Sequence, residues 1–228
     1  MTDARPLFAL LHLSDSLFPT GAFAHSDGLE AAIDAGVVRT PDDLGEWMDV
    51  CLDQSIARCD APAVRVAWHS LAVRDWTAIG AINAEIYAIR PSAAARRATR
   101  TMGARLVKTW HVVHPHPDLQ ALIEAVDVDL VMTLPTAFGV VCASSGIPAR
   151  QAIVGYIYTR LAGIASAAMR LMPIGQHHAH RLLAARLARA QNLVDAIAAG
   201  GGRPSACTPA LDIAAMSHQY VHSRLFRS

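Results

Sequence analysis

One stretch of the chain limits the choice of fold more than any other. Residues 152–172 carry only two charged side chains, Arg160 and Arg170. A run of about 20 apolar residues is long enough to cross a bilayer as a helix, but a charge near its middle, two tyrosines and several alanines disfavour insertion. The stretch therefore predicts a helix that is buried on nearly all sides inside a helical protein, or one that is shared with a second subunit.

Small residues recur along this predicted helix. They occupy every fourth position, at Gly155, Thr159, Gly163 and Ala167. Residues at that spacing share one helix face, and small side chains there let another helix approach closely. If the helix is shared with a second subunit, it suits a symmetric helix-packed dimer, with Gly163, Tyr156 and Tyr158 at the interface.

Helix-forming patterns cover most of the remaining chain, without the sustained alternation of a strand. The clearest start is the capping residue Thr40, followed by Pro41 and two aspartates that suit the positive end of a helix. This helix is expected to end near Cys59, and a new one to begin at residues 60–62. Others are expected at about 29–36, 76–89, 92–113, 134–144, 148–172 and 176–198. We predict an all-α fold, a single-domain bundle of about ten helices.

Two segments are predicted to lie outside the helices. Prolines at positions 115 and 117 make residues 114–118 a loop. The stretch that ends at position 209 is rich in glycine, proline and serine, which indicates a linker. The predicted boundaries are therefore a helical domain at 1–199, a linker at 200–209 and a C-terminal tail at 210–228.

The predicted tail has the pattern of a segment that binds another protein. It carries Leu225 and Phe226 between Arg224 and Arg227. Apolar anchors flanked by charges suit a segment that folds on a partner. We therefore expect the tail to be a partner-binding element.

The composition also favours protein partners. It is 53% hydrophobic and only 17% charged, whereas about a quarter of the residues in globular proteins are charged. So few charges leave apolar surface for another protein to cover. A net charge of +1 and an aromatic share of 6% argue against nucleic acid and anionic membranes as partners.

The four cysteines indicate the compartment. Cys51, Cys59, Cys142 and Cys207 fit no zinc-module spacing. Free thiols are typical of a reducing environment, and the apolar run at the N-terminus is too short for a secretory signal. We therefore expect a cytoplasmic protein.

Two groups of histidines raise the question of a metal site. They are His111, His114 and His116, and His177, His178 and His180. Imidazole binds nickel, copper and zinc, but neither group has a carboxylate or thiol at helical spacing to complete a site. We predict no resident metal, and these six histidines remain the alternative ligands.

Catalytic motifs are missing from the sequence. It contains no phosphate-binding loop, no dinucleotide fingerprint and no nucleophile elbow. Ser14, Asp15 and His25 are near neighbours in the sequence, but a triad is recognised by geometry, and the serine and aspartate suit a helix-ending turn. We therefore predict a protein that is not an enzyme.

Three stretches resemble one known family. Residues 13–30 (LSDSLFPTGAFAHSDGLE), residues 166–176 (SAAMRLMPIGQ) and the tail from residue 209 (PALDIAAMSH, then Tyr220 and SRLFRS) are similar to the signatures of the urease accessory protein F (UreF) family. Their order and separation also match, so the resemblance covers nearly the whole chain.

The resemblance implies a non-enzymatic, all-helical protein that dimerises. It implies binding to a second accessory protein, called D or H, and recruitment and regulation of the GTPase partner G. The assembly would deliver nickel to apo-urease, so that nickel is handled at most transiently and no cofactor is held.

The resemblance also suggests contact residues. Phe23 and His25, on a glycine-containing loop, would lie at a contact surface. The tail would dock on the D/H protein through Asp212, Met216, His218, Tyr220, Arg224, Leu225, Phe226 and Arg227. Two rival hypotheses stay open: a nickel- or zinc-binding metallochaperone that uses the histidine groups, and a helical enzyme with an apolar substrate in a buried cavity.

Overall fold

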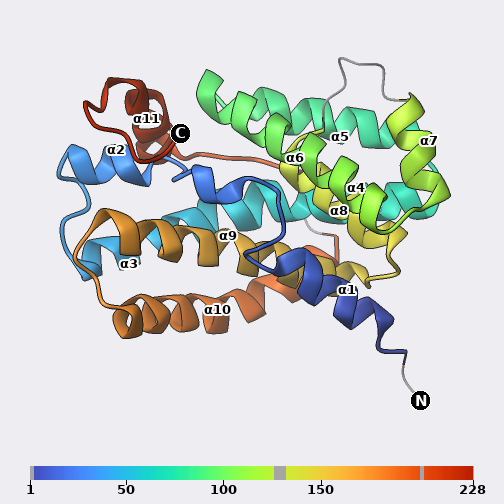
Figure 1. The fold of residues 1–228 in the computed structure, drawn as a ribbon, viewed down its shortest axis with the longest axis horizontal. Coiled ribbons are helices and arrows are strands. Elements are labelled where there is room, and N and C mark those ends of the chain that lie inside the picture. The colour runs from blue at the N-terminus through green and yellow to red at the C-terminus, as the bar shows by residue number, and fades with distance from the viewer. Residues whose placement is uncertain (1–2, 126–131, 201–202, 228) are drawn as a thin grey trace.

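The computed structural model describes residues 3–125, 132–200 and 203–227. Within those ranges every regular element is helical, which confirms the all-α prediction (Figure 1). The elements are α1 (Arg5–Ser14), η1 (Ala22–Ala24), α2 (Leu29–Asp34), α3 (Pro41–Val50), η2 (Cys51–Asp60), α4 (Ala61–Ala72), α5 (Trp76–Ile89), α6 (Ala93–Val113), α7 (Pro117–Ala125), α8 (Leu134–Ser144), α9 (Ala149–Leu171), α10 (Gln176–Ala198), α11 (Pro209–Ser217) and η3 (His218–Tyr220).

Helix α8 lies at the centre of the bundle, between α4 and α6. All its residues from Leu134 to Cys142 are buried. The first N–H groups of a helix have no partner within it, and here two buried side chains help to satisfy them. Asn83 on α5 accepts from the Thr133 amide at 2.7 Å, and Thr99 on α6 accepts from the Leu134 amide at 3.0 Å.

The segment from Pro41 to Ala72 is one continuous helical rod, so the predicted end near Cys59 is wrong. Its middle part, η2, is a wide π-helix. Pro62 has no N–H to donate to the Arg58 carbonyl, and the wider turn carries the chain past it without a break. The Arg58 carbonyl accepts instead from the amide of Ser205, at 3.0 Å, which holds the predicted linker against the rod.

Helix α9 is the apolar helix that the sequence singles out. By length and composition it could cross a membrane, but ten of its residues are buried against the bundle, where it packs on α10, α4 and α1. Gly155 leaves room for α1, because a Cβ there would lie 2.6 Å from the Leu10 side chain. The same row is open at Gly163, where a Cβ would meet nothing within 4 Å.

The C-terminal segment is folded onto the bundle. Helix α11 packs on α2 and α6 (Figure 1). Gly28, just before α2, allows this approach: its φ is +87°, and a Cβ would lie 3.1 Å from the Ala215 backbone nitrogen. The predicted tail is therefore ordered without a partner, although Ser228, like residues 201–202 of the predicted linker, lies outside the described residues.

The close approach of α6 to the start of α8 gives a stability test. A Cβ at Gly103 would lie 2.1 Å from the Met132 carbonyl oxygen, so Gly103→Ala should lower the free energy of unfolding by about 1–3 kcal/mol, the usual cost of overpacking. Urea denaturation measures the change. The matched control is Gly80→Ala on α5, where a Cβ meets nothing within 4 Å. It should be neutral or stabilising by about 0.5–1 kcal/mol, and equal tolerance at both sites would contradict this packing.

Candidate partner-binding site

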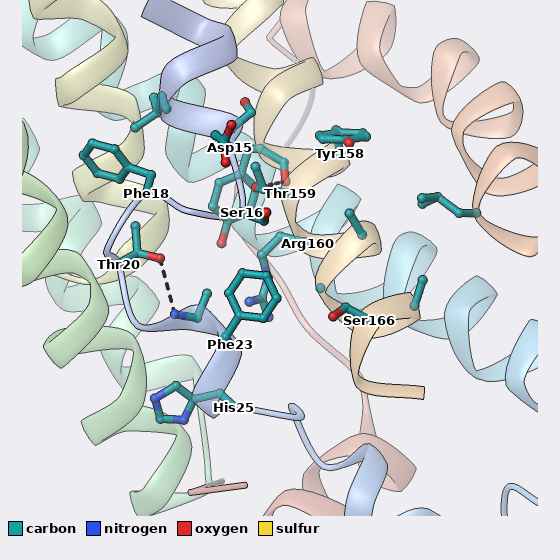
Figure 2. Close-up of a pocket in the computed structure, with 18 of the residues that line it drawn as sticks. Asp15, Ser16, Phe18, Thr20, Phe23, His25, Tyr158, Thr159, Arg160 and Ser166 are labelled. Atoms are coloured by element: carbon teal, nitrogen blue, oxygen red, sulfur yellow. Dashed lines mark hydrogen bonds between the residues drawn. The ribbon is translucent and has the colours of Figure 1, made fainter. Parts of the chain in front are cut away.

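A half-open pocket of about 580 Å³ lies between the end of α1, the loop at 15–25, α9 and the start of α10. Figure 2 shows Phe23 from the loop in the space between the loop and α9, with Tyr158, Thr159 and Ser166 on the α9 side. Two of the three family-like stretches, residues 13–30 and 166–176, supply much of its wall. The pocket is therefore where these distant parts of the sequence meet.

Short-range hydrogen bonds shape the loop. The Asp15 carboxylate accepts from the Leu17 amide at 2.7 Å, and the Thr20 hydroxyl accepts from the Ala22 amide at 3.3 Å. Gly21 has a φ of +83°, and a Cβ there would lie 2.6 Å from the Arg105 guanidinium. The positive φ favours glycine here, and a side chain at this position would also displace the end of Arg105.

The pocket wall is largely apolar, with a few polar groups. Phe18, Phe138 and Leu183 are buried in it, whereas Phe23 and Tyr158 are exposed at 49% and 42%. Pockets lined by apolar side chains with a few polar groups are typical of binding sites. This one is suited to accept apolar side chains from another molecule.

Two buried polar atoms in the lining lack a hydrogen-bond partner within the described residues. They are the Ser14 Oγ and the Arg160 Nε. The other end of the Arg160 guanidinium is engaged, because its Nη2 lies 2.6 Å from the Asp27 carboxylate. Burial lowers the pKa of the neighbouring His25 below its usual value, which favours the neutral imidazole.

The buried Glu30 carboxylate joins the tail to the start of α2. Its Oε2 lies 2.7 Å from the His218 Nε2 and accepts from the Phe226 amide at 3.2 Å, and its Oε1 accepts from the Leu225 amide at 2.6 Å. A carboxylate with several donors offsets the cost of its burial. The C-terminus of the chain is thereby fixed beside the N-terminal loop.

A second set of contacts ties the tail to the loop. The Arg170 guanidinium lies over the Phe226 ring, 4.1 Å from its centroid, and donates to the Phe23 carbonyl at 2.9 Å. The Arg227 amide donates to the Ala24 carbonyl at 2.7 Å. All three family-like stretches therefore meet around one side of the molecule.

The predicted contact residues divide into buried and exposed groups. His218 and Phe226 are buried within the chain, so neither side chain is exposed to a docking partner in this structure. Asp212 is half-buried, accepts from the Thr208 hydroxyl at 3.0 Å, and has a pKa raised by burial. The exposed residues are Phe23, Met216, Tyr220, Arg224, Leu225 and Arg227.

The predicted dimer residues divide in the same way. Tyr156 is 1% exposed, and its hydroxyl donates to the buried Asp60 at 2.8 Å. Asp60 also pairs with Arg90 at 2.5 Å. Tyr156 therefore belongs to the core of one protomer, which corrects its placement at a dimer interface, while Tyr158 and Gly163 are exposed.

The histidine groups do not gather into a site. Among the described residues no three or more histidine, cysteine, aspartate or glutamate side chains are placed to hold a metal. His177 and His180 are exposed and His178 is half-buried, all on the first turns of α10. His116 accepts from the Asp118 amide at 3.2 Å. His111 lies on the last turn of α6, and His114 ends that helix.

Sequence reasoning missed Glu30 and Arg170 as site residues. Both lie inside the family-like stretches, but a charged residue in a helix pattern is ordinarily assigned to the solvent face. Their roles depend on segments far away along the chain: the partners of Glu30 are 188–196 residues away, and Phe23 is 147 residues from Arg170. A local pattern does not contain that information.

The Glu30 contacts predict the effect of a single-atom change. Glu30→Gln puts an amide nitrogen among two backbone donors and an imidazole, so the tail should detach more often. We expect the free energy of unfolding to fall by about 1–3 kcal/mol and trypsin to cleave faster at Arg224. Glu46→Gln, at an exposed position on α3, is the control. Unchanged cleavage in Glu30→Gln would contradict the role of this carboxylate.

Comparison with known proteins places these features in one family. The UreF family model matches residues 38–187. The urease accessory protein UreF of Cupriavidus pinatubonensis (strain JMP 134 / LMG 1197) is 34% identical over 238 residues, which cover 100% of both chains. That of Azoarcus sp. (strain BH72) is 34% identical, covering 98% of this chain and 96% of the relative. That of Arthrobacter sp. (strain FB24) is 30% identical, covering 96% of each. The chain belongs to the UreF family of urease accessory proteins.

Proposed function

We propose that the protein assists nickel insertion into apo-urease as a non-catalytic assembly factor in the cytoplasm, by binding other accessory proteins. The family assignment supports the urease role. The observation that carries the binding role is the convergence of all three family-like stretches on one side of the molecule. There an apolar pocket lies beside exposed Phe23 and Leu225.

The proposed contact with the D/H accessory protein uses the outer side of the tail. Its inner side is already occupied, because Phe226 is 4% exposed and held by Arg170 and Glu30. Leu225 and Tyr220 point outward, with exposures of 60% and 81%. Tyrosine is enriched among the hot spots of interfaces, and an exposed leucine beside it adds apolar area for a partner to cover. The tail thus presents a preformed surface, which lowers the ordering cost of binding.

Placing a charge at an apolar side chain tests this surface. Leu225→Asp and Phe23→Asp should each weaken co-purification with the D/H protein, with affinity reduced about tenfold or more, as for a hot-spot residue. Val73→Asp is the matched control, because Val73 is 75% exposed and lies after α4, outside the pocket lining. All three variants should melt like the parent. If both Leu225→Asp and Phe23→Asp bind the D/H protein normally, the proposed contact surface is ruled out.

We further propose that the protein dimerises through the exposed side of α9 and the neighbouring α1. Tyr158 and Gly163 are exposed on α9, and α1 presents Leu7, Phe8 and Leu11 with more than half of each side chain exposed. Burial of such side chains in an isologous contact would remove apolar surface from water in both copies. This proposal keeps the predicted α9 interface without Tyr156.

Gly163→Leu separates the dimer contact from folding. Outside the backbone of α9 itself, no atom of the described residues lies within 4 Å of a Cβ at Gly163, so the free energy of unfolding of a monomer should be unchanged or higher. If a second copy packs there, the leucine should shift the monomer–dimer equilibrium towards monomer in light scattering. Gly80→Leu on α5 is the control. An unchanged dimer in Gly163→Leu would place the interface elsewhere.

The proposed complex recruits the GTPase partner G and regulates its GTP hydrolysis. The support is the family assignment together with the exposed apolar side chains that would remain beside a docked D/H protein. GTP turnover by G is measured with G alone and with the complex containing either the parent chain or Leu225→Asp. We expect the parent complex to change turnover and the variant to lose that effect. Equal turnover in all three mixtures would contradict regulation through this chain.

A further inference from the structure

Two histidines from distant parts of the chain face each other at the edge of the bundle. The Nδ1 of His12, on α1, lies 3.3 Å from the Nε2 of His114, the residue that ends α6. The pair is 102 residues apart in sequence. Both rings are at the surface, so a dissolved ion can reach them.

The separation of the two nitrogens fits a shared cation. It is longer than the 2.7–3.2 Å, about 2.9 Å at the mode, of ordinary N–H hydrogen bonds in proteins. Two imidazole nitrogens at about 2.0–2.1 Å from a tetrahedral zinc ion lie roughly 3.3–3.4 Å apart. The ring that donates this hydrogen bond can carry its proton on its other nitrogen instead. Both facing nitrogens then offer a lone pair to a metal ion after small ring rotations.

Neighbouring aromatic rings hold the pair in position. The His114 ring stacks on Trp110 with centroids 4.4 Å apart, and the His12 ring meets the edge of Phe18 at 5.3 Å. Trp110 is itself buried and donates to the Ser145 hydroxyl at 2.9 Å. Ligands that are oriented before binding lose less freedom when the ion arrives.

The electrostatic setting also favours a cation. His114 follows the last turn of α6, where the partial charge of a helix end is negative. A neutral imidazole with a free lone pair is the form that binds metal.

We propose that His12 and His114 form a two-histidine site for a divalent transition-metal ion that accepts tetrahedral nitrogen ligands, with zinc as the probe. Water would fill the remaining positions, because no third protein ligand is placed there among the described residues. Such a site exchanges its ion readily, unlike a closed four-ligand structural site. The site rests on this geometry alone, and holds whether or not the proposed urease contacts are correct.

The site differs from the groups that the sequence indicates. His114 belongs to one of them, but its partner is His12 rather than His111 or His116. His116 instead accepts from the Asp118 amide near the start of α7. The group of histidines in the sequence therefore includes His114, one proposed ligand, but not His12, the other.

Isothermal titration of the untagged full chain with zinc tests the site. Loss of even an outer-shell partner weakens metal binding by about 10–100-fold, so His12→Ala and His114→Ala should each weaken zinc binding at least about tenfold. Zinc should raise the Tm of the parent chain and not that of either variant, because an ion that binds only the folded state stabilises it.

Two controls make the result decisive. His222→Ala changes another exposed histidine, and the combined change of His177, His178 and His180 to alanine removes the other group. Both should bind zinc like the parent. Circular dichroism checks that every variant is folded. Parent-like zinc affinity in folded His12→Ala or His114→Ala, or loss of binding in the triple variant alone, would overturn the proposal.

Discussion

The buried Glu30 carboxylate is the contact on which the functional side of this molecule depends. Removing a carboxylate from water costs several kcal/mol unless donors replace the solvent, and here His218 and the amides of Leu225 and Phe226 do so. The contact fixes where the last residues of the chain lie. Phe226 then rests under Arg170, which also holds the loop of Phe23. One charged side chain thus determines which tail residues face inward and which remain available to a partner.

The helical scaffold supplies the rigid frame for that arrangement. α8 is buried between α4 and α6, and Gly103 brings α6 within contact distance of the backbone before α8. The π-helical part of the rod keeps Asp60 in the core, where it binds Arg90 and Tyr156. Pairing a buried acid with a cation and a hydroxyl satisfies its charge and orients α9. The exposed side of α9 and its pocket are therefore built on a core that resists rearrangement.

Local patterns predicted the helices well, because caps and the 3.6-residue period are local properties. The Thr40 capping box and the full extent of α10 are examples. Local patterns failed where a segment distant in the sequence decides whether a side chain is buried or exposed. Tyr156 has the same local character as Tyr158, yet only Tyr156 faces Asp60. In the sequence, His218 and Phe226 look like tail residues that are available to a partner. In the structure, His218 contacts Glu30 and Phe226 packs under Arg170. Helix α7 was not anticipated either, because Pro115 and Pro117 indicated a loop at 114–118, whereas Pro117 is the first residue of the helix.

The tail is docked on the bundle through Glu30 in the absence of any partner. Hydrogen exchange of the Leu225 and Phe226 backbone amides in the isolated chain tests it most directly, because both amides donate to that carboxylate. Bonded amides exchange only when the local structure opens. Both amides should exchange at least about tenfold more slowly than in an unstructured peptide of the same sequence. Exchange at the unprotected rate would contradict the docked tail, and with it the preformed binding surface.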